Sequence, residues 1–246
     1  MKGTTPPGAR DEREAALWVR DMFGRVAHRY DLANHLLSFN IDRLWRAHTA
    51  RRVRSVLERP DARVLDICCG TGDLVLALAG GAGASACHFF ASDFCHPMLT
   101  AARAKIESRR VHAPLFEADA LHLPLADGSL DLITAAFGFR NLANYGAGLE
   151  EMRRVLRPGG MAAILEFSRP SNAAFAALYE FYSRRILPRI GGALSGSPDA
   201  YRYLPESVRK FPSAPKLAEE MQRVGFEAVS YELLTGGIVA LHLAVK

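Results

Sequence analysis

The residues best suited to chemistry begin with an acidic side chain and a glycine turn. Asp66 lies in a short apolar run, and Gly70-Thr71-Gly72 follows just before a second apolar segment, 74–79. Glycine has no Cβ atom, so a ligand can come close to the backbone of such a turn. The first N–H groups of the next helix also point toward that ligand. This stretch of sequence therefore predicts a strand, a ligand-binding turn and a helix N-terminus.

Two more acidic positions follow the next two apolar runs. Asp93 closes the run 87–92, about 20 residues after the turn, which is the interval expected for a carboxylate that holds a ribose. Asp119 and Ala120 follow the third run, where nucleoside sites place polar groups against adenine. Parallel strands end at one edge of a sheet, so these residues should meet there. We predict a nucleoside site made of Asp66, Gly70, Thr71, Gly72, Asp93, Asp119 and Ala120.

The order of these features resembles the S-adenosylmethionine-dependent methyltransferases. Cys68 stands where a dinucleotide fingerprint has its first glycine, and no third glycine follows at the usual offset. S-adenosylmethionine is therefore the expected cofactor. An NAD enzyme or a nucleotide-binding relic is the alternative.

The predicted strands and helices that position these residues alternate along the chain, as they do in a doubly wound sheet. We predict an α/β, Rossmann-like fold: a mostly parallel seven-stranded sheet with an N-terminal helical lid and a C-terminal antiparallel hairpin. One domain should span 1–246, with 1–11 disordered, a lid over 12–58, and a core over 62–246 that carries a helical insertion at about 173–210. Asp42 is expected to cap a helix that ends at Leu57. The expected strands are 63–67, 87–92, 112–117, 130–136, 161–167, 226–234 and 237–245.

Composition narrows the class of protein. The chain has 246 residues, of which 49% are apolar, which is enough for one sizeable core. Its net charge of +5 is compatible with nucleic acid, an anionic membrane surface or neither. The four cysteines form no Cys-x-x-Cys pair, so we expect no metal site and reduced thiols in the cytoplasm. Residues 74–92 lack charged side chains, but their glycines favour a helix, turn and strand over a membrane span.

Beyond the nucleoside site, a further resemblance is specific. Phe137-Gly138-Phe139-Arg140-Asn141 replaces the Asn/Asp-Pro-Pro-Tyr loop of methyltransferases that act on the nitrogen of bases and amides. With it, the chain resembles the ubiquinone/menaquinone biosynthesis C-methyltransferases from about Met22 to its end. The other matching segments are Arg29-Tyr30-Asp31, Leu37-Ser38-Phe39, Arg43-Leu44-Trp45, Glu166-Phe167-Ser168, Leu187-Pro188-Arg189-Ile190-Gly191, Tyr201-Arg202-Tyr203-Leu204 and Val239-Ala240-Leu241-His242.

This resemblance implies methyl transfer from S-adenosylmethionine to a ring carbon of a prenylated quinol. Cys68-Cys69 stands where many ubiquinone members have Ala-Gly, which favours the menaquinone branch and conversion of demethylmenaquinol to menaquinol. By family position, Thr71 contacts the cofactor in the turn, Asp93 the ribose, and Asp119 with Ala120 the adenine. The alternatives are a benzoquinol precursor of ubiquinone, alone or in addition, and another small-molecule methyltransferase. An RNA substrate is disfavoured because no RNA-binding module is appended.

The catalytic residues are less defined. A quinol carbon becomes nucleophilic when a ring hydroxyl gives up its proton, a step that needs help near neutral pH. Arg140 follows the fourth strand and is expected to stabilise a developing phenolate, while Asn141 orients the oxygen or a water. Tyr30, with His28 and His35, is a candidate for the proton. The alternative is structural: Arg140 pairs with an acid such as Asp31, and the lid side chains merely pack.

One predicted helix has two interpretations. Residues 173–187 carry an aromatic and aliphatic surface beside basic side chains, which fits either a peripheral membrane contact with anionic lipid or a groove for the prenyl tail. The alternative is packing under the lid. The membrane interpretation would place the protein in the cytoplasm, peripherally at the inner face of the membrane. A homodimer is left open. The residues concerned are Phe175, Leu178, Tyr179, Phe181, Tyr182, Ile186, Leu187, Arg184, Arg185 and Arg189.

Overall fold

A seven-stranded sheet organises the computed structural model, which describes residues 2–29, 31, 35, 36, 38–83, 86–170, 172–186 and 198–246. The strand order is β3-β2-β1-β4-β5-β7-β6, and only β7 runs antiparallel to both of its neighbours. This arrangement confirms the predicted Rossmann-like sheet with its closing hairpin. The strands are β1 (Arg63–Ile67), β2 (His88–Asp93), β3 (Leu115–Glu117), β4 (Leu130–Ala136), β5 (Leu156–Phe167), β6 (Glu227–Leu234) and β7 (Val239–Val245).

Helices cover both faces of the sheet because its strands are apolar on both sides. In β1, Val64 packs in the cluster formed with one layer of helices, whereas Leu65 and Ile67 pack in the cluster formed with the other. The first layer contains α3 (Ile41–Arg52), α4 (Arg54–Leu57), α5 (Asp73–Ala82) and α6 (His96–Ser108). The second contains α7 (Tyr145–Val155) and α11 (Ala214–Arg223).

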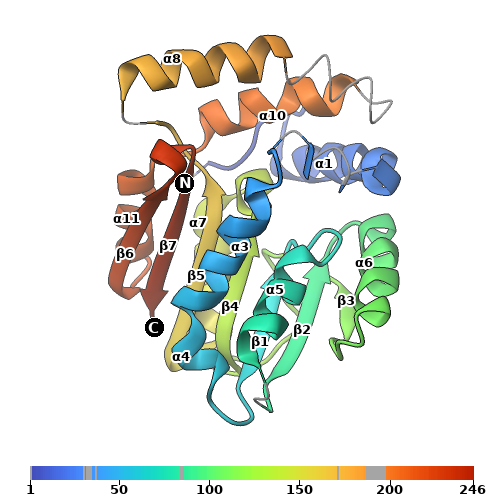
Figure 1. Cartoon of the computed structure of the whole chain (residues 1–246), viewed down its shortest axis with the longest axis vertical. Coiled ribbons are helices and arrows are strands. Elements are labelled where there is room, and N and C mark those ends of the chain that lie inside the picture. The colour runs from blue at the N-terminus through green and yellow to red at the C-terminus, as the bar shows by residue number, and fades with distance from the viewer. Residues whose placement is uncertain are drawn as a thin grey trace.

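A third group of helices lies across one end of the sheet, at the top of Figure 1. It consists of α1 (Glu12–Val26), α8 (Ala173–Phe181), which continues as a π-helical turn at Tyr182–Ile186, and α10 (Pro198–Lys210). Helix α1 begins at Asp11, whose side chain accepts a hydrogen bond from the backbone N–H of Glu14 at 2.8 Å. Short 3-10 turns at Ala27–Arg29, Phe139–Asn141 and Thr235–Gly237 complete the same region.

Three local predictions were wrong. Residues 2–11 are not disordered in the structure: Gly3 and Thr4 donate backbone hydrogen bonds to the carbonyls of Ala143 and Leu142 at 3.1 and 2.8 Å. Asp42 is not a helix cap, because α3 starts after Asn40 and Asp42 lies in its first turn. The helix expected to end at Leu57 is also interrupted at Val53.

Other boundaries agree more closely. Helix α7 ends just before Arg157-Pro158-Gly159-Gly160, as the proline and glycines predict, although β5 already begins at Leu156. Most of the uncharged stretch 74–92 belongs to α5 or β2. Within the described residues, no helix combines the length and the apolar character needed to cross a membrane. The single-domain assignment, the lid and the insertion stay predictions.

Candidate functional site

The glycine turn after β1 opens its backbone toward a pocket. Gly70 lies in the left-handed region (φ +54°), and a Cβ built there would meet no atom within 4 Å. Gly72 is also left-handed (φ +85°) and ends the turn at the start of α5, but a Cβ there would lie 3.0 Å from Ile106. Gly70 therefore leaves room for a ligand, whereas Gly72 allows α6 to pack closely.

Asp93 ties the end of β2 to this turn. Its Oδ2 atom accepts a hydrogen bond from the N–H of Gly70 at 2.8 Å, and its Oδ1 atom accepts one from the N–H of Cys95 at 2.9 Å. Burial raises the pKa of Asp93 to about 6, although the N–H donors favour the charged form. The carboxylate is thus held rigidly beside the turn, where each oxygen keeps a lone pair for a ligand.

Asp66 is the second buried acid of the site. It is 1% exposed, and its Oδ1 atom accepts a hydrogen bond from the Thr134 hydroxyl at 2.7 Å. Burial raises the pKa of Asp66 to about 7, and the Thr134 hydrogen bond offsets only part of that rise. A cation placed beside this carboxyl would favour its ionised form.

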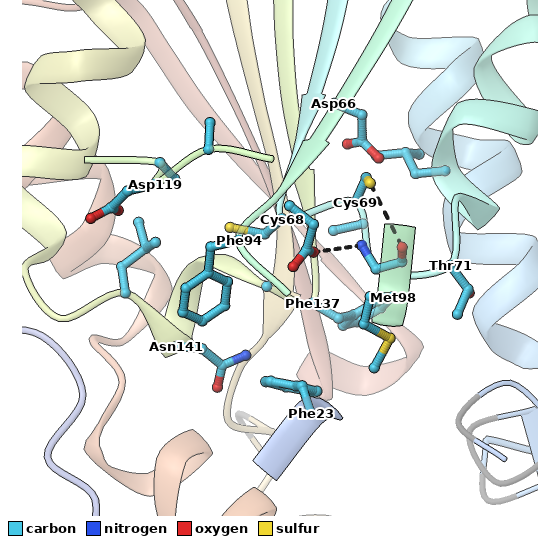
Figure 2. Close-up of a pocket in the computed structure, with 18 of the residues that line it drawn as sticks. Phe23, Asp66, Cys68, Cys69, Thr71, Phe94, Met98, Asp119, Phe137 and Asn141 are labelled. Carbon is cyan, nitrogen blue, oxygen red and sulfur yellow. Dashed lines mark hydrogen bonds between the residues drawn. The ribbon is translucent and has the colours of Figure 1, made fainter. Parts of the chain in front are cut away.

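These residues surround one pocket at the carboxyl ends of the strands, as Figure 2 shows. The pocket encloses about 930 Å³, including open solvent at its mouth. Six of the seven residues predicted for the nucleoside site line it, and Gly72 does not. Asn141 lines it as well. The six are Asp66, Gly70, Thr71, Asp93, Asp119 and Ala120.

The lining fits a sulfonium nucleoside. Open backbone at Gly70 accommodates a close ligand, and buried carboxylates suit sugar hydroxyls and positive charge. Asp119 is exposed, and its Oδ1 atom accepts the N–H of Leu121 at 2.9 Å, so it presents an oxygen near the rim. In Figure 2, Asp119 lies across the pocket from Asp66 and Thr71.

Thr71 connects the turn to the N-terminal segment. Its hydroxyl donates a hydrogen bond to Asp31 and accepts one from Lys105 Nζ at 3.0 Å. Lys105 also forms ion pairs with Asp31 and, at 2.7 Å, with Asp73. Asp31 is therefore bound to Lys105, and the acid that pairs with Arg140 is Glu166 instead of the suggested Asp31.

A second, more aromatic pocket adjoins the first. It encloses about 1460 Å³, including open solvent, and shares Phe23, Arg46 and Phe137 with the nucleoside pocket. Phe137 has a left-handed backbone (φ +59°), which a bulky residue rarely adopts. Its ring packs on those of Trp45 and Phe167, with centroids 5.8 and 4.8 Å away. Further lining residues are Met22, Ile41, Arg140, Tyr179, Tyr182 and Tyr203.

Arg140 belongs to this second pocket and not to the first. It is 4% exposed, and its Nη1 atom lies 3.0 Å from Oε1 of Glu166, which is 1% exposed. Nη1 also donates to the carbonyl of Phe137, and Oε2 of Glu166 accepts the backbone N–H of Arg140 at 3.1 Å. The guanidinium lies over the Phe167 ring, 5.2 Å from its centroid. The end of β5 therefore fixes a buried positive charge in the wall of an aromatic pocket.

Asn141 is held by a short chain of hydroxyl groups. The Tyr203 hydroxyl donates to Asn141 Oδ1 at 3.1 Å and lies 2.6 Å from the Thr4 hydroxyl. Because the amide oxygen accepts this hydrogen bond, the amide nitrogen is the part of Asn141 left for the pocket. In Figure 2, Asn141 and Phe23 lie on the side of the pocket away from Asp66.

The predicted proton acceptors fall into three cases. Tyr30 lies outside the described residues. His28 is exposed, and the His35 ring lies between Asp42 Oδ2 at 2.8 Å and Asp73 Oδ2 at 3.7 Å; neither histidine lines the nucleoside pocket or the second pocket. Trp45 was not one of these candidates; it is buried and donates to the Thr235 hydroxyl at 2.8 Å.

Tyrosines in the second pocket are poor bases. Burial raises the pKa of Tyr179 to about 12 and also raises those of Tyr182 and Tyr203. All three hydroxyls therefore stay protonated near neutral pH and act as hydrogen-bond donors. These three tyrosines therefore do not serve as the group that takes the proton.

Several residues of the site were not predicted. Each binds a partner that is distant in sequence: Glu166 binds Arg140, 26 residues away, Lys105 binds Thr71, 34 residues away, and Tyr203 binds Asn141, 62 residues away. No local sequence pattern predicts such pairs. Arg46 carries one signal that was available. It follows Asp42 by four residues on a predicted helix, a spacing that favours an ion pair, and the structure contains that pair.

Comparison with known proteins identifies the family. A demethylmenaquinone methyltransferase of Thermus thermophilus is 48% identical over 90% of this chain and 98% of its own length. One of Deinococcus radiodurans is 41% identical over the full length of both chains. The crystal structure of a SAM-dependent methyltransferase from Aquifex aeolicus covers 79% of this chain and 88% of its own with a TM-score of 0.57, and at 20% identity it shows the shared fold alone. The model of the ubiE/COQ5 methyltransferase family matches residues 9–246, and the chain therefore belongs to that family.

Proposed function

We propose that this protein transfers a methyl group from S-adenosylmethionine to a ring carbon of demethylmenaquinol and so forms menaquinol. One observation supports this most: an acid-lined nucleoside pocket shares a wall with an aromatic pocket that holds a buried guanidinium. The relatives named demethylmenaquinone methyltransferase match over most of their length, which favours the same substrate class here.

The nucleoside pocket would hold the cofactor by contacts at five residues. Asp93 accepts from the ribose hydroxyls, Asp119 and the backbone at Ala120 receive the adenine, and the open backbone at Gly70 allows close approach. Asp66 faces the cationic part of the ligand, where its carboxyl becomes charged. Thr71 supports the turn. When bound, S-adenosylmethionine supplies an electrophilic methyl group on a sulfonium.

In the second pocket, Arg140 would act on the quinol. Its positive charge stabilises the oxygen of a ring hydroxyl as that hydroxyl gives up its proton to water, which raises electron density on the adjacent ring carbon. Glu166 fixes the guanidinium, and Asn141 donates its amide N–H to the same oxygen or to the water. After methylation, the ring carbon loses its proton to solvent and the aromatic ring is restored.

The rim of the second pocket fits a lipid-soluble tail. Phe39 lines this pocket but is 73% exposed, and its ring lies 6.3 Å from that of Tyr182. On α8, Tyr179 lines the pocket, whereas Leu178 and Phe181 are 63% and 58% exposed. We propose that these exposed apolar groups rest on the bilayer, so that a prenyl chain passes from the membrane into the pocket. This would place the protein peripherally at the inner face of the membrane.

An assay with defined quinols tests the proposal. The purified protein is incubated with methyl-labelled S-adenosylmethionine and either reduced demethylmenaquinone or a prenylated benzoquinol, and the products are identified by mass. We expect label in menaquinol and little or none in the benzoquinol product. Transfer to the benzoquinol alone would contradict the proposed substrate, and transfer to neither would contradict the proposed reaction.

The membrane contact has its own test. Co-sedimentation with anionic liposomes should fall when Leu178 and Phe181, which are exposed and do not line the second pocket, are both replaced by serine, while turnover of a quinol with a short, water-soluble tail stays normal. Equal binding by both proteins would remove the membrane proposal without affecting the chemistry. A homodimer stays a prediction.

A further inference from the structure

The charges that line the nucleoside pocket are strongly one-sided. Four carboxylates line it, and Arg46 is the one cationic side chain among the described residues that do so. Near neutral pH, S-adenosylmethionine carries a sulfonium, an ammonium and a carboxylate. Carboxylate walls suit the two cations and the sugar hydroxyls, but they repel the negative group of the ligand. That group needs a positive partner in a pocket that offers a single one. The four acids are Asp66, Asp73, Asp93 and Asp119.

Arg46 is fixed beside the glycine turn. Its Nη1 atom is paired with Asp42 on the same helix, and its side chain is only 11% exposed. Its Nη2 atom lies 4.0 Å from Oδ2 of Asp73, which is the first residue of α5 and directly follows Gly72. The guanidinium therefore occupies the end of the pocket where the turn meets the helix.

The guanidinium also keeps donor capacity. In the hydrogen bonds found among the described residues, Arg46 donates once, from Nη1 to Asp42. The separation from Asp73 is too long for a hydrogen bond, and Asp73 has a closer partner in Lys105 at 2.7 Å. A buried guanidinium has five N–H groups, and a carboxylate is the ligand that best matches its planar edge.

We propose that Arg46 binds the carboxylate of the methionyl group of S-adenosylmethionine, an inference that rests on the proposed function. Arg46 also lines the quinol pocket, and its Cζ atom lies 5.2 Å from the centroid of the Phe137 ring, which is part of the shared wall. A carboxylate bound to Arg46 therefore helps to hold the shared wall at Phe137, which separates the cofactor from the quinol.

Two other assignments compete with this one. The free N–H groups at the start of α5 are an alternative partner for the carboxylate. Alternatively, Arg46 acts from its other side on a quinol oxygen. The three assignments differ in which ligand loses affinity when the guanidinium is removed.

Calorimetric titration with two cofactor forms separates them. Decarboxylated S-adenosylmethionine keeps the nucleoside, the sulfonium and the amine but lacks the carboxylate. The wild-type protein should bind S-adenosylmethionine about 10- to 100-fold more tightly than the decarboxylated form. Arg46→Met should weaken S-adenosylmethionine alone, so that the two affinities come within about threefold of each other.

Two further variants keep the result interpretable. Arg43→Met changes an exposed arginine of the same helix that lines neither pocket, and it should retain the full preference. Arg46→Met leaves Asp42 without its guanidinium, so the double variant with Asp42→Asn removes both charges. It should unfold at the temperature of the wild-type protein and still lack the preference.

Several outcomes would overturn the assignment. If Arg46→Met weakens both ligands equally, or keeps the wild-type preference, the carboxylate is bound elsewhere. If both affinities are unchanged and only KM for the quinol rises, Arg46 serves the second pocket. A wild-type protein that binds neither form would overturn the cofactor itself, and with it the proposed function, which is a different result from a lost preference.

Discussion

The two pockets of this protein share a wall, but their linings differ in charge and in aromatic content. The nucleoside pocket combines apolar side chains with four carboxylates and the open backbone of Gly70, mostly at the ends of β1 and β2. The second pocket is lined by aromatic and aliphatic side chains, most of which come from α1, α3, α8 and α10. The first is therefore fixed by the rigid sheet, whereas the second depends on how separate helices pack over its end. Fixed charge suits an invariant cofactor, and a helix-lined aromatic cavity suits a bulky apolar substrate.

The largest expected effect separates catalysis from cofactor binding. Arg140→Met should lower kcat about 100- to 1000-fold, because it removes the charge that stabilises the phenolate. The dissociation constant of S-adenosylmethionine should stay within about threefold of the wild-type value, since Arg140 lies only in the second pocket. Stopped assays and calorimetry measure the two quantities.

A matched control accounts for the buried charge that Arg140→Met leaves behind. Glu166 would then be unpaired and 1% exposed, which destabilises the fold. Adding Glu166→Gln removes that charge and should restore the melting temperature but not kcat. If the double variant regained turnover, Arg140 would have no role in the chemistry.

Cofactor affinity should be most sensitive at Asp93. Asp93→Asn should raise the dissociation constant of S-adenosylmethionine about 100-fold, because the amide cannot accept the N–H groups of both Gly70 and Cys95 and still hold a ribose. Asp119→Asn, at an exposed residue with one N–H donor, should cost less. Equal losses at both positions would mean that burial does not distinguish these two acids.

Asp66 gives the nucleoside pocket a dependence on pH. Its native pKa of about 7 lies above the ordinary value, so between about pH 4 and pH 7 the native state binds more protons than the unfolded state. Stability contributed by this carboxyl is therefore lost as pH rises through that window. Without cofactor, the free energy of unfolding of Asp66→Asn, taken relative to wild type, should increase by about 2 kcal/mol from pH 5 to pH 8. Urea denaturation at both pH values measures this gain, and a constant gap would show that Asp66 titrates normally.

The second pocket should respond to a loss of aromatic area. Tyr179→Ala should raise KM for demethylmenaquinol about tenfold by removing a ring from the lining, with cofactor affinity unchanged. Leu178→Ala changes the neighbouring exposed residue and should leave KM for a short-tailed quinol unaltered. Equal effects of the two variants would place the tail outside this pocket.

The smallest expected effect concerns orientation. Tyr203→Phe removes the hydroxyl that donates to Asn141 Oδ1, so the amide should lose its fixed direction and kcat should fall about fivefold. Cofactor affinity should be retained. In a protein that already carries Asn141→Ala, adding Tyr203→Phe should have almost no further effect on kcat, because the Tyr203 hydroxyl acts only through Asn141. Additive losses in the double variant would contradict a positioning role.

The cofactor pocket was largely predictable because its determinants are local. A strand, a glycine turn and a helix start lie within 63–82, and the rule that parallel strands end at one edge brings Asp93 and Asp119 to them. The second pocket was not predictable in this way. Trp45 reaches Thr235 across 190 residues, and which helix faces meet depends on the whole chain.

Amphipathic spacing also left the aromatic helix ambiguous. Tyr179 and Tyr182 face the pocket, while Leu178 and Phe181 are exposed on the same short helical segment. Both pairs have the spacing of one helical face, so the sequence alone could not tell the lining from the surface. The partner of Arg140 was missed for a similar reason, since β5 brings Glu166 to it through strand pairing.

The arm at residues 2–5 has a practical consequence for variation in this protein. A side chain at Gly3 would collide with the backbone of Ala143, because its Cβ atom would lie only 2.2 Å from the carbonyl carbon of that residue. Thr4 anchors the hydroxyl chain that reaches Asn141. Changes at these positions, which no motif marks, would thus reach the side chain of Asn141 through two hydrogen bonds. Sequence surveys that score only the motifs would misjudge such alleles as silent.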